Sequence, residues 1–90
     1  MQIRLKAVTM NNNVDPEKIY WIESMVCLFI ASEKKISNID AFEIFSKSKT
    51  HSMLMDNDMK MWYFSPEALF QIWKVEEDTD DPRNSPYLEA

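Results

Sequence analysis

The longest apolar stretch of the chain runs from Ile19 to Ala31, where eleven of thirteen residues are apolar or aromatic. Asp15 and Pro16 stand just before it as a helix-start signal, because aspartate caps free backbone amides and proline suits the first helical turn. The apolar positions recur at helical spacing and extend well past half the circumference. The pattern predicts a long helix over 16–33 that other segments must cover on most sides.

Two shorter amphipathic helices are predicted after this central one. Ser37 opens a capping box, and apolar residues at three-residue intervals follow it, which predicts a helix over 38–47. Ser65 and Pro66 repeat the start signal of the first helix, and apolar residues at helical spacing follow them. A third helix is therefore predicted over 66–77.

The segments between and before these helices have weaker patterns. A single helical turn is predicted near 51–55, and Asp56 begins a turn. Residues 59–64 are apolar or aromatic at nearly every position and predict a strand or an extended segment. Residues 1–10 alternate apolar and basic side chains in part, so segment 1–13 is either a short strand that pairs with 59–64 or a disordered arm.

These elements predict a mainly α fold, a small three-helix domain with one or two short extended or strand segments. The predicted organisation is an N-terminal arm or strand at 1–13, a helical domain at 14–77 and an acidic tail at 78–90. Residues 76–90 hold six acidic residues and one arginine, which equals the formal net charge of −5 of the whole chain. We expect a solvated, frayed terminus there, which disfavours phosphate backbones and would suit a basic protein partner.

Composition excludes several classes of function. Without any glycine, the chain cannot form the glycine-rich loops that bind nucleotides. The single cysteine, Cys27, excludes an intramolecular disulfide and fits a reducing cytoplasm, and the apolar run is too short to span a bilayer. His51 is the only histidine and has no cysteine near it in sequence. We therefore expect a cytoplasmic protein that is not an enzyme and holds no metal or cofactor.

Four methionines form two Met-x-Met pairs beside the histidine. Thioether ligands suit Cu(I), but methionine also fills gaps in protein cores and forms adaptable surfaces for partners. The pattern favours a role in the core and leaves the other two open. The four residues are Met53, Met55, Met59 and Met61.

The predicted helices at 16–33 and 38–47 also have the order of a helix-turn-helix. Lysines lie at the ends of these helices, but the second helix exposes mainly Asp40 and Glu43, which repel phosphate groups. A small DNA-binding transcriptional regulator of this type is the alternative function.

Residues 17–31, Glu-Lys-Ile-Tyr-Trp-Ile-Glu-Ser-Met-Val-Cys-Leu-Phe-Ile-Ala, are followed at 36–45 by Ile-Ser-Asn-Ile-Asp-Ala-Phe-Glu-Ile-Phe. This order resembles a family of small uncharacterised bacterial helical proteins (a domain of unknown function, DUF3791-like). The resemblance covers about 17–64 and consists of a long apolar helix, a polar turn and a second helix with aromatic residues. Members are often encoded beside putative toxins of the ADP-ribosyltransferase-like kind, so the resemblance implies an antitoxin or accessory role.

We therefore expect a non-catalytic protein–protein interaction module that forms a homodimer and binds a protein partner, such as a neighbour-encoded toxin. Neither a membrane nor a nucleic acid is expected as a partner. Three helices cannot bury every aromatic ring of so short a chain, and uncovered rings mark interfaces. Completion of the core by the same rings is the alternative. The candidate partner-binding residues are Trp62, Tyr63, Phe64, Phe70, Trp73, Tyr87 and Leu88.

Overall fold

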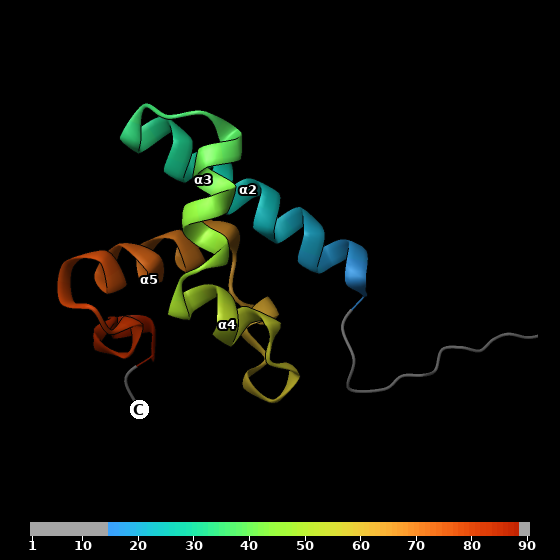
Figure 1. The fold of residues 1–90 in the computed structure, drawn as a ribbon. Coiled ribbons are helices and arrows are strands. Elements are labelled where there is room, and N and C mark those ends of the chain that lie inside the picture. The colour runs from blue at the N-terminus through green and yellow to red at the C-terminus, as the bar shows by residue number, and fades with distance from the viewer. Residues whose placement is uncertain (1–14, 89–90) are drawn as a thin grey trace, which may run out of the picture.

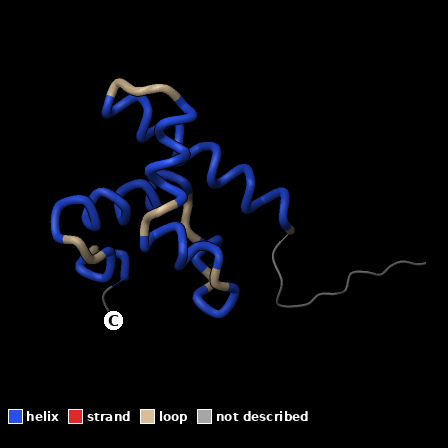
Figure 2. Tube along the Cα trace, in the orientation of Figure 1, coloured by secondary structure: helices blue, strands red, loops and turns tan. Residues whose placement is uncertain are grey.

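The computed structural model of the protein describes residues 15–88, and in this part of the chain it contains helices and connecting turns but no strand (Figure 2). The fold is mainly α, as the sequence predicts. The α-helices are α2 (Pro16–Lys34), α3 (Asn38–Ser46), α4 (Lys49–Met55) and α5 (Pro66–Thr79). The shorter 3-10 helices are η1 (Asn57–Met59), η2 (Met61–Tyr63), η3 (Pro82–Asn84) and η4 (Pro86–Leu88).

Helix α2 runs diagonally through the molecule and contacts both α3 and α5, while α4 packs against α3 and α5 (Figure 1). Ile22, Val26 and Ile30, one above the other on α2, are fully buried. They meet buried residues from every other α-helix in a single core. These other core members include Ala41, Phe45, Met53, Leu54, Leu69, Ile72 and Trp73.

The starts of α2, α3 and α5 are those that the sequence predicts. The side chains of Asp15, Ser37 and Ser65 each accept a hydrogen bond from a backbone amide of the first turn. Because the chain has no glycine, non-glycine residues take the left-handed conformation at the ends of two α-helices, at Lys35 with φ 58° after α2 and at Asp80 with φ 67° after α5. These positions cost roughly 1 kcal/mol each in backbone strain.

The prediction of a strand or extended segment at 59–64 is wrong. The region is two 3-10 turns, η1 and η2, separated by Lys60 in the left-handed conformation with φ 54°. Asp56 accepts a hydrogen bond from the amide of Asp58, which starts the first turn. A strand needs a neighbour to bond with, and none is present in residues 15–88. The predicted arm or strand at 1–13 lies outside the described residues.

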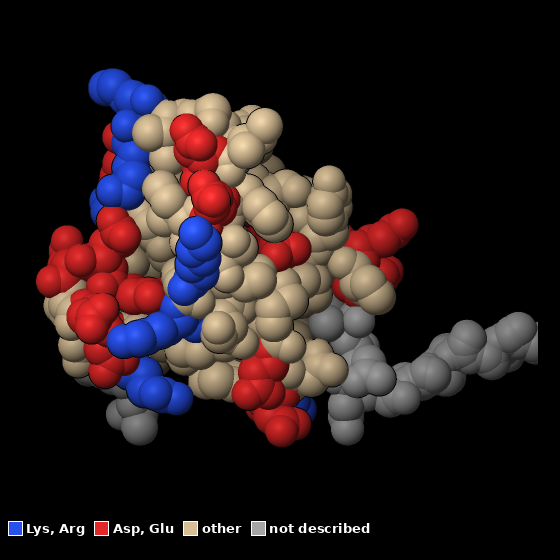
Figure 3. All heavy atoms as spheres, in the orientation of Figure 1, with Lys and Arg blue, Asp and Glu red and all other residues tan. Residues whose placement is uncertain are grey.

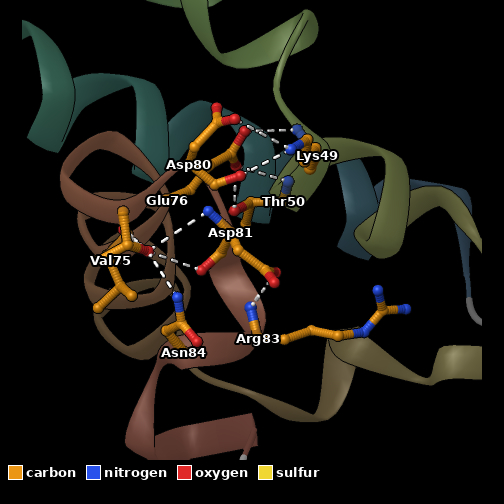
Figure 4. Close-up of polar contacts among 9 residues, drawn as sticks. Lys49, Thr50, Val75, Glu76, Asp80, Asp81, Arg83 and Asn84 are labelled. Carbon is orange, nitrogen blue, oxygen red and sulfur yellow. Dashed lines mark hydrogen bonds and ion pairs between the residues drawn. The ribbon is translucent and has the colours of Figure 1, made fainter.

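Helix α4 is longer than the single turn predicted near 51–55, and a carboxylate from α5 fixes its start (Figure 4). Ser48 caps the helix by accepting from the amide of His51. One oxygen of Glu76 accepts from the amide of Lys49 at 2.8 Å, and the other accepts from the amide and the hydroxyl of Thr50 at 2.9 and 2.7 Å. Since Thr50 is fully buried, this carboxylate satisfies donors that water cannot reach.

The acidic C-terminal segment, which we expected to fray, is folded as far as Leu88. Helix α5 ends at Thr79, Asp80 caps it, and η3 then turns back against it. Thr79 Oγ1 donates to the carbonyl of Val75 and accepts from the side-chain amide of Asn84. Ser85 is fully buried. The segment therefore completes the core instead of extending into solvent.

Replacement of Glu76 by glutamine should destabilise the protein by about 1–3 kcal/mol, because an amide nitrogen would face a backbone donor where a charged oxygen now accepts. Urea unfolding followed by circular dichroism measures this. The matched control is Glu77→Gln, one residue further along α5, which loses only an exposed ion pair with Lys34 and should cost no more than about 1 kcal/mol. Equal losses for the two variants would contradict the role of Glu76.

Candidate functional site

The candidate partner-binding aromatic residues do not form one surface. Trp62 and Trp73 are buried core residues. Phe70 is partly buried between Phe29 and Trp73, at centroid distances of 5.6 and 6.1 Å. The alternative left open by the sequence, that these rings complete the core, describes Trp62 and Trp73.

The other candidates lie near the C-terminal segment or on the surface. Phe64 meets Tyr87 edge to face at 6.0 Å, and Phe64 and Leu88 are partly buried against the core. Tyr87 is itself exposed, and Tyr63 is 77% exposed beside Trp62. Only Tyr63 and Tyr87 of the seven candidates therefore present large uncovered surfaces.

Truncation separates these two groups of rings. Trp73→Ala should destabilise the protein by about 3–5 kcal/mol because it empties a buried site. Tyr63→Ala should change stability by no more than about 0.5 kcal/mol because its ring is exposed. Urea unfolding of both variants measures the difference, and a small effect of Trp73→Ala would contradict its place in the core.

A different apolar surface remains uncovered, on α2 and α3. Tyr20 is 72% exposed and Leu28 is 47% exposed on α2, and Phe42 is 51% exposed on α3. Trp21 and Ile39, which neighbour this surface in sequence, are exposed as well. The sequence predicts that other segments cover α2 on most sides. In the structure, the side of α2 that carries Tyr20 and Leu28 is left uncovered.

Two neighbouring hollows lie along α2, and we call the two together the α2 groove. The first, of about 430 Å³, lies between α2 and α3, and the second, of about 570 Å³, lies between α2 and α4 with η1. Tyr20 and Glu23 line both hollows, which places the two hollows next to each other along α2. The remaining lining residues are Ser24, Cys27, Leu28, Asn38 and Phe42 in the first, and Pro16, Ile19, Leu54, Met55 and Asn57 in the second.

Glu23 and His51 form a partly buried pair in this region. Glu23 Oε2 lies 2.5 Å from His51 Nε2, and each side chain is 16% exposed. The imidazole also packs edge to face on the buried ring of Phe45 at 5.2 Å. These contacts hold the Glu23 carboxylate in place between the two hollows. The pair links α2 to α4, which no spacing in the sequence indicates.

Cys27 lines the first hollow one helical turn after Glu23. Burial raises the pKa of its thiol to about 11, and the negative charge of Glu23 adds to the effect. A nucleophilic cysteine needs a lowered pKa, so this site keeps the thiol in its unreactive form at neutral pH. Cys27 and Glu23 lie close together, but their electrostatic interaction opposes formation of a thiolate.

Alkylation by iodoacetamide at pH 8 tests this protection. A pKa near 11 instead of 9.0 lowers the thiolate fraction about a hundredfold. Cys27 should therefore react at least about tenfold more slowly in the folded protein than in guanidinium. Glu23→Gln should raise the folded rate, whereas Glu33→Gln, near the end of the same helix, should not. A folded thiol that reacts faster than the unfolded one would contradict an inert cysteine.

The four methionines divide between core and surface. Met53 and Met61 are buried, whereas Met55 and Met59 are exposed. Two of them thus fill the core, as the pattern favours, and Met55 lines the α2 groove. Within residues 15–88, no three His, Cys, Asp or Glu side chains gather closely enough to hold a metal ion.

Comparison of the chain with models of known protein families, with curated proteins and with solved structures finds no match. The resemblance to the small bacterial helical family therefore stays a prediction. In the part of the chain from 15 to 88, no helix combines the length and the apolar character that a membrane span requires.

Proposed function

We propose that the protein is a non-catalytic protein–protein interaction module and that the α2 groove is its binding surface. The observation that carries the proposal is the uncovered apolar lining of this groove, formed by Tyr20 and Leu28 of α2 with Phe42 of α3. Exposed apolar surface around a hollow is typical of binding sites, because its burial is favourable only when a partner covers it.

The architecture supports this function. The core on the other side of α2 is continuous through Ile22, Val26 and Ile30, so the groove rests on a packed support. Sites on such supports bind with little cost of rearrangement. The pair of Glu23 and His51 further fixes α4, which forms one edge of the groove.

The resemblance implies an antitoxin or accessory role, and we propose this role as the cellular function of the interaction module. The partner is then a neighbour-encoded toxin, and a homodimer is the expected assembly. DNA binding, the alternative, has less support, because α3 presents the exposed carboxylates of Asp40 and Glu43. Glu43 Oε2 lies 3.7 Å from Nζ of Lys47, the residue that follows α3, and this ion pair offsets the positive charge of the lysine.

Site-directed photocrosslinking in the native host tests the surface. A photoreactive benzoylphenylalanine replaces Phe42 in the groove, and the control variant carries it at Tyr63, an exposed ring outside the groove. We expect one defined adduct from position 42 that position 63 does not give and that Leu28→Ala weakens. Mass spectrometry of the adduct identifies the partner and distinguishes it from a second copy. The same adducts from both positions, or none from 42, would overturn the proposal.

A further inference from the structure

The α2 groove is apolar, and acidic residues outnumber basic ones around it. Among the residues directly next to its lining residues in sequence, one is basic, Lys18. The lining itself contributes a carboxylate, that of Glu23. In the view of Figure 3, scattered acidic groups lie around an uncharged area over the N-terminal half of α2, and the visible basic groups lie mostly toward the C-terminal ends of α2, α3 and α5, where the densest acidic cluster also lies over α5. The acidic neighbours are Asp15, Glu17, Glu43, Asp56 and Asp58.

Glu23 contributes the negative charge nearest the middle of the groove. Its Oε2 is engaged by His51, whereas Oε1 receives no side-chain hydrogen bond from residues 15–88. One oxygen is thus held in position and the other can accept from a donor in the groove. An ammonium or guanidinium group that reached it would form a charge-assisted hydrogen bond in a partly buried setting.

The length of the groove sets the size of its occupant. From Pro16 to Leu28 the lining follows twelve steps along α2, or about 18 Å at 1.5 Å per residue. This length matches about three turns of a partner helix, whose apolar side chains at i, i+3, i+4 and i+7 would enter the hollows. Its polar face would then meet the carboxylates at the edges.

On this basis, and resting on the proposed function, we propose that the α2 groove binds a basic amphipathic helix of a partner protein. A second copy of the chain is a poorer occupant, because two copies joined groove to groove would bring the acidic residues that surround one groove toward those that surround the other. Like charges placed together across an interface repel each other, whereas lysine or arginine side chains of a partner would be attracted to these carboxylates.

Binding of three fluorescent 18-residue peptides, followed by anisotropy in 150 mM salt, tests this inference. The first has leucines at helical spacing and lysines elsewhere, the second replaces every lysine by glutamate, and the third scrambles the first. We expect the lysine peptide to bind at least about tenfold more tightly than either of the others, because both charge and helical apolar spacing are needed.

Variants of the full chain locate the site. The double variant Leu28→Ala, Phe42→Ala should weaken binding of the lysine peptide at least about tenfold, as truncation of apolar anchors does. Both side chains are about half exposed, so the fold should survive, and circular dichroism checks this. The matched control is Tyr63→Ala with Tyr87→Ala, which removes two exposed rings outside the groove and should leave binding unchanged.

The outcomes separate this inference from the proposed function. If the glutamate peptide binds as tightly as the lysine peptide and the groove variant weakens both, the groove is a binding surface but the basic partner is wrong. If the groove variant binds the lysine peptide as tightly as the control variant does, the α2 groove is not the binding surface and the proposed function is overturned. Sedimentation that shows a dimer dissociated by the groove variant would assign the groove to a second copy and overturn the inference.

Discussion

Helix α2 is apolar around most of its circumference, and residues 15–88 cover only part of it. Ile22, Val26 and Ile30 point into the core, which they share with buried residues of α3, α4 and α5, and burial of these apolar side chains stabilises the fold. The other side of the helix keeps Tyr20 and Leu28 in solvent. The same helix therefore stabilises the fold on one side and carries the candidate binding surface on the other.

The groove depends on how firmly α4 is held, because α4 forms one of its edges. A seven-residue helix has little stability of its own. Glu76, on α5, accepts hydrogen bonds from the first two backbone amides of α4. The contact between His51 and Glu23 connects the middle of α4 to α2. These two carboxylates act at different points of one short helix. They make its position a consequence of tertiary contacts rather than of local propensity.

The sequence predicts the helices well because their start signals are local. The side chains of Asp15, Ser37 and Ser65 cap helices through hydrogen bonds to amides two or three residues further on, so these caps do not depend on tertiary contacts. The strand or extended segment predicted at 59–64 is wrong because a run that is apolar at nearly every position carries no period. The left-handed conformation of Lys60, which separates the two turns, is not recognisable from residue type. The uncovered surface at Tyr20 and Phe42 was missed for a related reason. Periodicity identifies the apolar face of a helix, but it does not show which part of that face neighbouring elements cover.

The candidate aromatic residues also show that the sequence does not distinguish buried side chains from exposed ones. Trp62 and Trp73 were grouped with Tyr63 by sequence, yet the first two are buried and the third is exposed. In a 3-10 turn, adjacent residues point about 120° apart, so neighbouring rings reach opposite environments. Aromatic content alone therefore says how much apolar surface the chain carries and not where it is exposed. What distinguishes the α2 groove is the combination of uncovered rings, a hollow and a held carboxylate, and only tertiary structure brings these three together.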